Sequence, residues 1–268
     1  IIVIHRMMLH KRKFKSYIRI LERALKEINK EEYRFIYARL LGIYGNFKAY
    51  KGEYEEGLIL LKKGMQILES TGNYQKMLYP LNSIGIIYYN HYTNTQKARE
   101  YYERCLSISQ RLGDVYYESA CYNNIADQCR MEDKYSAALQ FYQNSLKNAR
   151  IIGDKYIEIV INLNISLANI ELEEYNKALF NFENVEKLMM EFKYPGDYID
   201  LFYQCQAEFF YTMGEYEKAY ECAQKSVDMC ITWGIPENYE AHFVKLMSEM
   251  QMNGRLDYER INAFLDRT

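Results

Sequence analysis

The amino-acid sequence predicts an all-α fold, an α-solenoid of about six to seven antiparallel helix pairs. Three observations support this prediction. A sequence pattern recurs about every 40 residues, apolar residues within each copy follow helical spacing, and Gly-Asn or Gly-Asp pairs separate the copies. The composition is 49% apolar and 26% charged with only 3 prolines, which excludes a disordered or low-complexity chain.

Each copy contains an aromatic residue that is followed three residues later by a small residue. The clearest copies begin at Tyr54, Tyr135, Tyr175 and Tyr216. Their spacings are 81, 40 and 41 residues, and a degenerate copy that ends at Ala98 fills the wide gap. A step of 40 residues back from the first copy reaches Phe14. A fixed period of this length indicates a repeat architecture, in which each unit buries its apolar side against the next.

Every copy continues as an amphipathic helix and is preceded by another one. In the copy at Tyr135 apolar residues recur at three- and four-residue steps, and a second stripe begins at Tyr122. The pairs between copies are Gly72-Asn73, Gly113-Asp114, Gly153-Asp154 and Gly196-Asp197. Glycine can end one helix in the left-handed conformation, and Asn or Asp can cap the next. Pro80 follows the first of these pairs closely and predicts a kinked or late-starting helix.

The period divides the chain into a single solenoid domain, residues 1–268. Its expected parts are a partial repeat 1–32, five repeats at about 33–72, 73–113, 114–153, 154–196 and 197–234, and a C-terminal capping helix pair 235–268. The first residue is Ile rather than Met, and Ile1 to Met8 is expected to be a helix already under way. We therefore expect the chain to be part of a longer polypeptide.

Small residues are placed where paired helices would touch. Gly85, Ala126, Ser166 and Ala207 lie twelve or thirteen residues before the small residues that end the repeat motifs. This order of Gly or Ala, then Tyr, then Ala resembles the tetratricopeptide repeat, in its extended variety of about 40 residues. The resemblance covers essentially the whole chain and implies a right-handed superhelix. The family's tryptophan is absent from the first helices, where Tyr122 and Tyr203 stand instead.

The resemblance implies a concave groove lined by the first helix of each pair. The candidate groove residues are Arg39, Asn46, Tyr79, Asn82, Tyr89, Asn123, Asn124, Asp127, Arg130, Asn164, Gln204, Glu208 and Tyr211. Asn124 and Asn164 are 40 residues apart, and Asn82 and Asn123 form a second such pair. Because a carboxamide both donates and accepts, a ladder of them can hold the backbone of an extended peptide.

Such ladders resemble those of the extended tetratricopeptide receptors of Gram-positive bacteria, the Rap, NprR and PlcR group. The resemblance implies a protein- or peptide-binding scaffold, the cytoplasmic sensory or interaction domain of a bacterial signalling or transcriptional regulator. The alternative hypothesis is a structural module that dimerises or docks an output domain of the parent chain and binds no free peptide. A modulator of phosphotransfer is a weaker enzymatic alternative.

No pattern of catalytic or metal-binding residues accompanies the repeats. The sequence has no Gly-rich phosphate loop, no zinc-ligand spacing and no Gly-x-Ser-x-Gly motif. The four histidines are scattered, and the six cysteines lie singly in apolar segments, as buried reduced thiols do. We therefore expect no enzyme activity, no cofactor and no metal.

Charge and hydropathy narrow the class of partner. The net charge is −2, although residues 1–30 carry nine basic and two acidic side chains and so have a charge of +7. A single basic end is a poor nucleic-acid surface, so we expect no nucleic-acid partner. No apolar run approaches the ~18 residues that cross a bilayer, so we expect no membrane partner.

Overall fold

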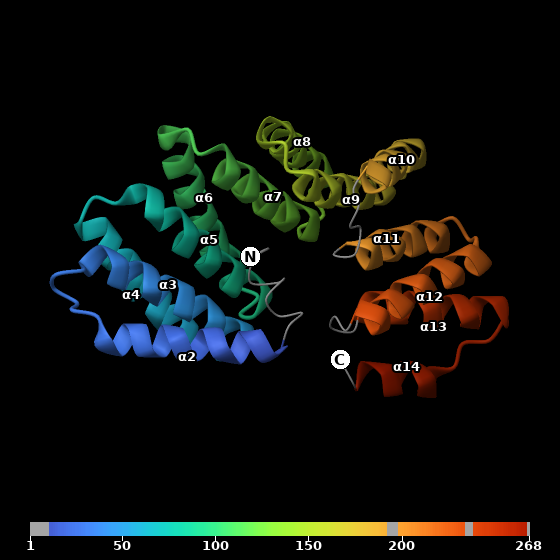
Figure 1. Ribbon diagram of the computed structural model, residues 1–268. Coiled ribbons are helices and arrows are strands. Elements are labelled where there is room, and N and C mark those ends of the chain that lie inside the picture. Colours follow the sequence, from blue (N-terminus) through green and yellow to red (C-terminus); the bar gives the residue numbers. More distant parts are fainter. Residues whose placement is uncertain (1–10, 192–197, 234–237, 267–268) are drawn as a thin grey trace. The chain divides into compact units, whose positions relative to one another are not determined.

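The computed structural model describes residues 11–191, 198–233 and 238–266 (Figure 1). Within these ranges it contains thirteen α-helices and no strand. The chain divides into two compact units, the first ending at Gly153 and the second beginning at Asp154. The predicted helix that includes Ile1 to Met8 and the predicted Gly196-Asp197 cap lie outside the described residues.

The first unit contains seven of these helices. They are α2 (Lys11–Glu27), α3 (Arg34–Tyr50), α4 (Tyr54–Ser70), α5 (Tyr74–Asn90), α6 (Thr95–Leu112), α7 (Val115–Met131) and α8 (Tyr135–Ile152). The second unit contains the other six. They are α9 (Lys155–Glu171), α10 (Tyr175–Glu191), α11 (Ile199–Thr212), α12 (Tyr216–Trp233), α13 (Tyr239–Met252) and α14 (Tyr258–Leu265).

Consecutive helices form antiparallel pairs. In the first unit α3 packs on α4, α5 on α6 and α7 on α8, and in the second α9 packs on α10 and α11 on α12 (Figure 1). Each unit has its own apolar core, which includes Leu61 and Leu81 in the first and Phe182 and Phe209 in the second. The all-α fold of antiparallel pairs predicted from the sequence is confirmed, whereas the single solenoid over 1–268 stays a prediction.

The turns between pairs follow the predicted chemistry with one exception. Gly72, Gly113 and Gly153 have φ angles of +69°, +66° and +73°, in the left-handed region. Oδ1 of Asp114 accepts from the backbone N–H of Tyr117, which caps α7, and Asp154 caps α9 in the same way. The predicted Asn73 cap is wrong. Its side chain donates to the hydroxyl and carbonyl of Thr71 and accepts no cap hydrogen bond.

A second set of left-handed residues lies inside the pairs and was not predicted. Positive φ angles occur at Gly52, Thr93, Asp133, Glu173, Gly214 and Gly254. These residues recur every 40 or 41 positions, just before the second helix of each pair. Three of them are not glycine, so the backbone geometry of the repeat is kept where the residue type does not favour it.

Pro80 does not delay the helix that contains it. Helix α5 begins at Tyr74 and continues through Pro80 to Asn90, so the predicted late start is wrong. Proline has no N–H to donate to the carbonyl of Lys76, yet Pro80 is buried among the helices of the first unit. Burial of this segment, with Met77, Leu78 and Leu81 in the same core, offsets the missing hydrogen bond.

Small residues bring paired helices close together. A Cβ at Gly45 would lie 2.8 Å from the carbonyl oxygen of Gly57, so α3 and α4 meet backbone to backbone. In the second unit Oγ of Ser166 donates to the carbonyl of Ala178 at 3.4 Å, which joins α9 to α10 at the predicted position. All six cysteines are buried and none forms a disulfide, as predicted. No helix among the described residues is long and apolar enough to cross a membrane.

Candidate functional site

A buried carboxamide joins the first helices of two neighbouring pairs. Asn46 lies on α3, and its Nδ2 donates to the hydroxyl of Tyr79 at 2.5 Å and to Oγ of Ser83 at 3.0 Å. Both partners lie on α5. Asn46 is only 6% exposed, and an amide that is buried requires such partners. The hydrogen bonds therefore hold α3 and α5 in register on this face.

A second carboxamide pair joins the next two first helices. Nδ2 of Asn124 on α7 donates to Oδ1 of Asn82 on α5 at 2.8 Å. Both residues were predicted for the groove, but not as partners of each other. The amide of Asn124 has a second N–H and a carbonyl oxygen, and the side chain is only partly buried. It can therefore bond a ligand without losing its contact with Asn82.

A carboxylate lies one helical turn further along α7. Asp127 accepts from the hydroxyl of Tyr142 at 2.5 Å and from Nδ2 of Asn123 at 3.2 Å. Burial raises the pKa of Asp127 to about 6, although these hydrogen bonds and the charge of Arg130 act in the opposite direction. Nε of Arg130 is buried without a hydrogen-bond partner among the described residues. The hydroxyl of Tyr89 also reaches the backbone carbonyl of Asp127, at 3.5 Å.

These polar groups border a cavity of about 490 Å³, which we call the Asn46 cavity. Its lining includes the predicted residues Asn46, Tyr89, Asn124 and Asp127, together with Tyr50, Tyr54, Ser83, His91 and Tyr102. The rings of Tyr54 and His91 stack with centroids 3.6 Å apart. The cavity therefore has aromatic walls and a small number of fixed polar groups, as binding sites commonly do.

Tyr102 enters the Asn46 cavity from a second helix. The sequence analysis limited the groove to first helices and missed this residue. The ring lies where a Cβ at Gly85 would be, so only glycine at that position lets α6 place an aromatic ring against α5. Gly85 was predicted as a site of close packing, and that signal could have pointed to a large neighbour.

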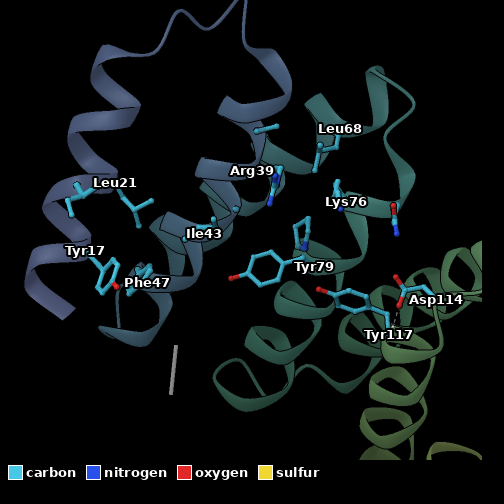
Figure 2. Close-up of a pocket in the computed structure, with 15 residues that line it drawn as sticks. Tyr17, Leu21, Arg39, Ile43, Phe47, Leu68, Lys76, Tyr79, Asp114 and Tyr117 are labelled. Carbon is cyan, nitrogen blue, oxygen red and sulfur yellow. Dashed lines mark hydrogen bonds between the residues drawn. The ribbon is translucent and has the colours of Figure 1, made fainter. Parts of the chain in front are cut away.

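A second cavity of about 590 Å³, which we call the Arg39 cavity, lies in the same unit (Figure 2). Its lining residues are Tyr17, Ile20, Leu21, Ala38, Arg39, Gly42, Ile43, Phe47, Leu68, Gln75, Lys76, Tyr79, Pro80, Asp114 and Tyr117. Arg39 and Tyr79 were predicted for the groove. The other lining residues were not predicted, because α2, α4 and the start of α7 also contribute to the wall.

The two cavities share a polar boundary. Asn46 lines one cavity and Tyr79 lines the other, and the two side chains are hydrogen-bonded. Burial raises the pKa of the Tyr79 phenol to about 12, so its O–H keeps its proton at neutral pH. The Asn46–Tyr79 bond therefore separates two adjoining hollows on the face made by α3, α5 and α7.

The remaining predicted groove residues lie in the second unit. Asn164 is on α9, and Gln204, Glu208 and Tyr211 are on α11. Nε2 of Gln204 donates to Glu208 and Oε1 accepts from Asn238, each at 2.9 Å, so both ends of this carboxamide have partners. A cavity of about 310 Å³ in this unit lies elsewhere, between α13 and α14, where it is lined by His242, Lys245 and Phe264 among others. The structure thus gathers the predicted residues of the first unit around two cavities, but does not do so for those of the second.

Metal-ion chemistry has no visible basis in the parts of the chain that the structure describes. Those residues contain no group of three or more His, Cys, Asp or Glu side chains placed to share a metal ion. The polar groups at the two cavities are amides, phenols, an imidazole, one carboxylate in each and two basic groups. Such groups can bind and orient a ligand through hydrogen bonds and charge.

Residues 93–151, which contain α6, α7 and α8, match the family model of the tetratricopeptide repeat. The described chain is thus a tetratricopeptide-type scaffold, as the sequence predicted. No curated protein matches the chain.

Three solved structures illustrate the shared fold. NprR in complex with its cognate peptide NprX is 17% identical with a TM-score of 0.70, over 97% of this chain and 73% of that one. A Rap protein complexed with Competence and Sporulation Factor is 18% identical with a TM-score of 0.70, over 98% and 71%. BtubC from P. vanneervenii is 13% identical with a TM-score of 0.67, over 84% and 94%.

Proposed function

We propose that the first unit binds a peptide or an extended protein segment along the face formed by α3, α5 and α7. The observation that supports this most is the pair of adjoining cavities on that face, bordered by polar side chains that hydrogen bonds hold in place. Groups fixed before binding lose little conformational entropy when a ligand arrives, which favours affinity. The proposal extends to the role of sensory or interaction domain in a bacterial signalling or transcriptional regulator.

The polar groups suit a peptide backbone better than they suit a reaction. Asn124 keeps one N–H and its carbonyl oxygen for a ligand, since its bond to Asn82 uses a single N–H. The hydroxyl of Tyr89 lies beside it at the Asn46 cavity. Peptide groups present one donor and one acceptor per residue, so amides and phenols can bind them whatever the side chains are. Two similar folds, NprR and a Rap protein, are described as complexes with a peptide factor.

Affinity selection tests the proposal and identifies the ligand in one experiment. A synthetic heptapeptide library with free carboxyl termini is incubated with the protein, bound peptides are sequenced by mass spectrometry, and the enriched peptides are resynthesised for calorimetry. We expect Asn124→Ala to weaken binding at least tenfold, which is about 1.4 kcal/mol, because it removes hydrogen bonds at the Asn46 cavity. Asn181→Ala on α10 is the matched control, since Asn181 is a partly exposed helical asparagine of the second unit.

The result can go against the proposal in two ways. Equal affinity of a folded Asn124→Ala variant and the wild type would remove the Asn46 cavity from the binding site. Failure to enrich any peptide, with self-association in sedimentation experiments, would instead favour the alternative of a dimerisation or docking module.

A further inference from the structure

The Arg39 cavity carries more basic than acidic groups. Arg39 and Lys76 line it, both are exposed, and neither forms an ion pair with any residue that the structure describes. The guanidinium of Arg39 lies 5.7 Å from the ring centre of Phe35, a contact that leaves its N–H groups free to donate. Asp114 is the acidic lining residue, and its Oδ1 already accepts from the backbone N–H of Tyr117 to cap α7. The cavity therefore attracts an anion.

Two phenols add donors to this basic region. The hydroxyl of Tyr79 accepts from Asn46, and a hydroxyl that accepts one bond still has its own proton to donate. Burial raises the pKa of Tyr79 to about 12 and also raises the pKa of Tyr117, so both phenols stay protonated at neutral pH. Figure 2 shows both rings at the α5 and α7 side of the cavity.

The opposite side of the same cavity is apolar. Leu21 from α2 and Ile43 and Phe47 from α3 form this wall, and Figure 2 shows them on the other side of Arg39 from Lys76. Tyr17 and Ile20 of α2 continue the wall and remain 43% and 59% exposed. A ligand that covered these side chains would remove apolar surface from water, at about 25 cal/mol per Å².

We propose that the Arg39 cavity binds an apolar monocarboxylate, that is, a carboxylate attached to an aliphatic or aromatic group. The carboxylate accepts from Arg39, Lys76 and the Tyr79 hydroxyl, and the apolar group packs on Leu21, Ile43 and Phe47. The volume of about 590 Å³ falls in the ~300–1,000 Å³ range of small-ligand sites. This site is distinct from the Asn46 cavity, so its test does not depend on the proposed peptide site.

The chemistry has two sources, a free carboxylic acid or the carboxyl terminus of a peptide. Calorimetry with decanoate and its neutral analogue decanol tests the first. The dipeptide Gly-Leu as free acid and as amide tests the second, without involving the Asn46 cavity. We expect at least one acid to bind tenfold or more tightly than its neutral partner, because only the acid pairs with Arg39 and Lys76. The arm in which this difference appears identifies the source.

Charge-neutral variants assign the difference to this cavity. Arg39→Gln and Lys76→Gln should each reduce the preference for the acid at least threefold and bring it close to one when combined. Arg111→Gln and Lys147→Gln are the matched controls, since both residues are exposed in the same unit and line neither cavity. Equal binding of each acid and its neutral partner, or an acid preference that survives the double Arg39 and Lys76 substitution, would overturn the proposal.

Discussion

Asp127 is the residue at which burial and charge oppose each other most clearly. It lies at the Asn46 cavity, holds hydrogen bonds from Tyr142 and Asn123, and has a pKa raised to about 6 by burial. A carboxyl group whose pKa is higher in the folded than in the unfolded chain stabilises the fold only while it is protonated. Its ionised form is therefore retained at neutral pH at a cost in stability, as polar groups at binding sites often are.

The Asp127→Asn variant tests this cost. Asparagine can accept the same hydrogen bonds and does not titrate. From the raised pKa of about 6, we expect the free energy of unfolding of the wild type to fall relative to the variant as the pH rises from 4 to 6, by up to about 3 kcal/mol. Urea unfolding at several pH values measures the difference. A difference that is constant across this range would show that Asp127 is not desolvated in the folded protein.

At the scale of elements, the repeat is held by two kinds of backbone constraint. The turn inside each pair needs a left-handed residue, and glycine meets that need at Gly52 while Thr93 does so without the advantage of glycine. Paired helices also meet closely, and at Gly45 the approach excludes any side chain. Both constraints concern single positions, so each can be tested by one substitution.

The turn constraint predicts opposite effects at equivalent positions. Gly52→Ala, at a φ angle of +82°, should destabilise the protein by about 1 kcal/mol, because a Cβ is strained there. Thr93→Gly, at +47°, should leave stability unchanged or raise it by up to about 1 kcal/mol. Chemical denaturation of both variants measures these changes. A clear loss of stability in Thr93→Gly would mean that its side chain, which donates to the carbonyl of Tyr92, outweighs the strain.

The packing constraint predicts a contrast between two glycines of helix α3. Gly45→Ala should cost about 2–3 kcal/mol, since its Cβ would lie 2.8 Å from the carbonyl oxygen of Gly57. Gly42→Ala should be neutral or stabilising by up to about 1 kcal/mol, since its Cβ would lie 3.7 Å from the Tyr79 ring and alanine favours helix. Thermal unfolding of the two variants compares them, and similar melting temperatures would contradict the close approach of α3 and α4.

The sequence was sufficient for the repeat and insufficient for the reach of individual side chains. The 40-residue period and its helical spacing predicted antiparallel pairs because each pair must bury its apolar side against the next. The left-handed turns at Thr93 and Glu173 carry no residue signal, and the repeat backbone alone imposes them. Repeat position placed Asn46 and Asn124 on the same face, but their partners depend on the distance between helices, which no local pattern encodes.

At the scale of the whole molecule, each compact unit has its own core, so local stability should follow the unit. We expect Gly45→Ala to lower hydrogen-exchange protection in α3, α4 and α5 more than in α9, α10 and α11, because repeat proteins are stabilised chiefly by contacts between neighbours. Hydrogen exchange read by mass spectrometry resolves these segments. An equal loss of protection in both units would indicate a single cooperative body.

Photo-crosslinking tests the central claim, that the first unit binds a peptide on the face of α3, α5 and α7, most directly. A peptide enriched by the wild-type protein is resynthesised with one benzoylphenylalanine, irradiated on the protein, and the attachment sites are located by mass spectrometry. We predict attachment to residues that line the Asn46 and Arg39 cavities, lost when unlabelled peptide competes. Attachment confined to residues 154–268, or unaffected by the competitor, would contradict the account.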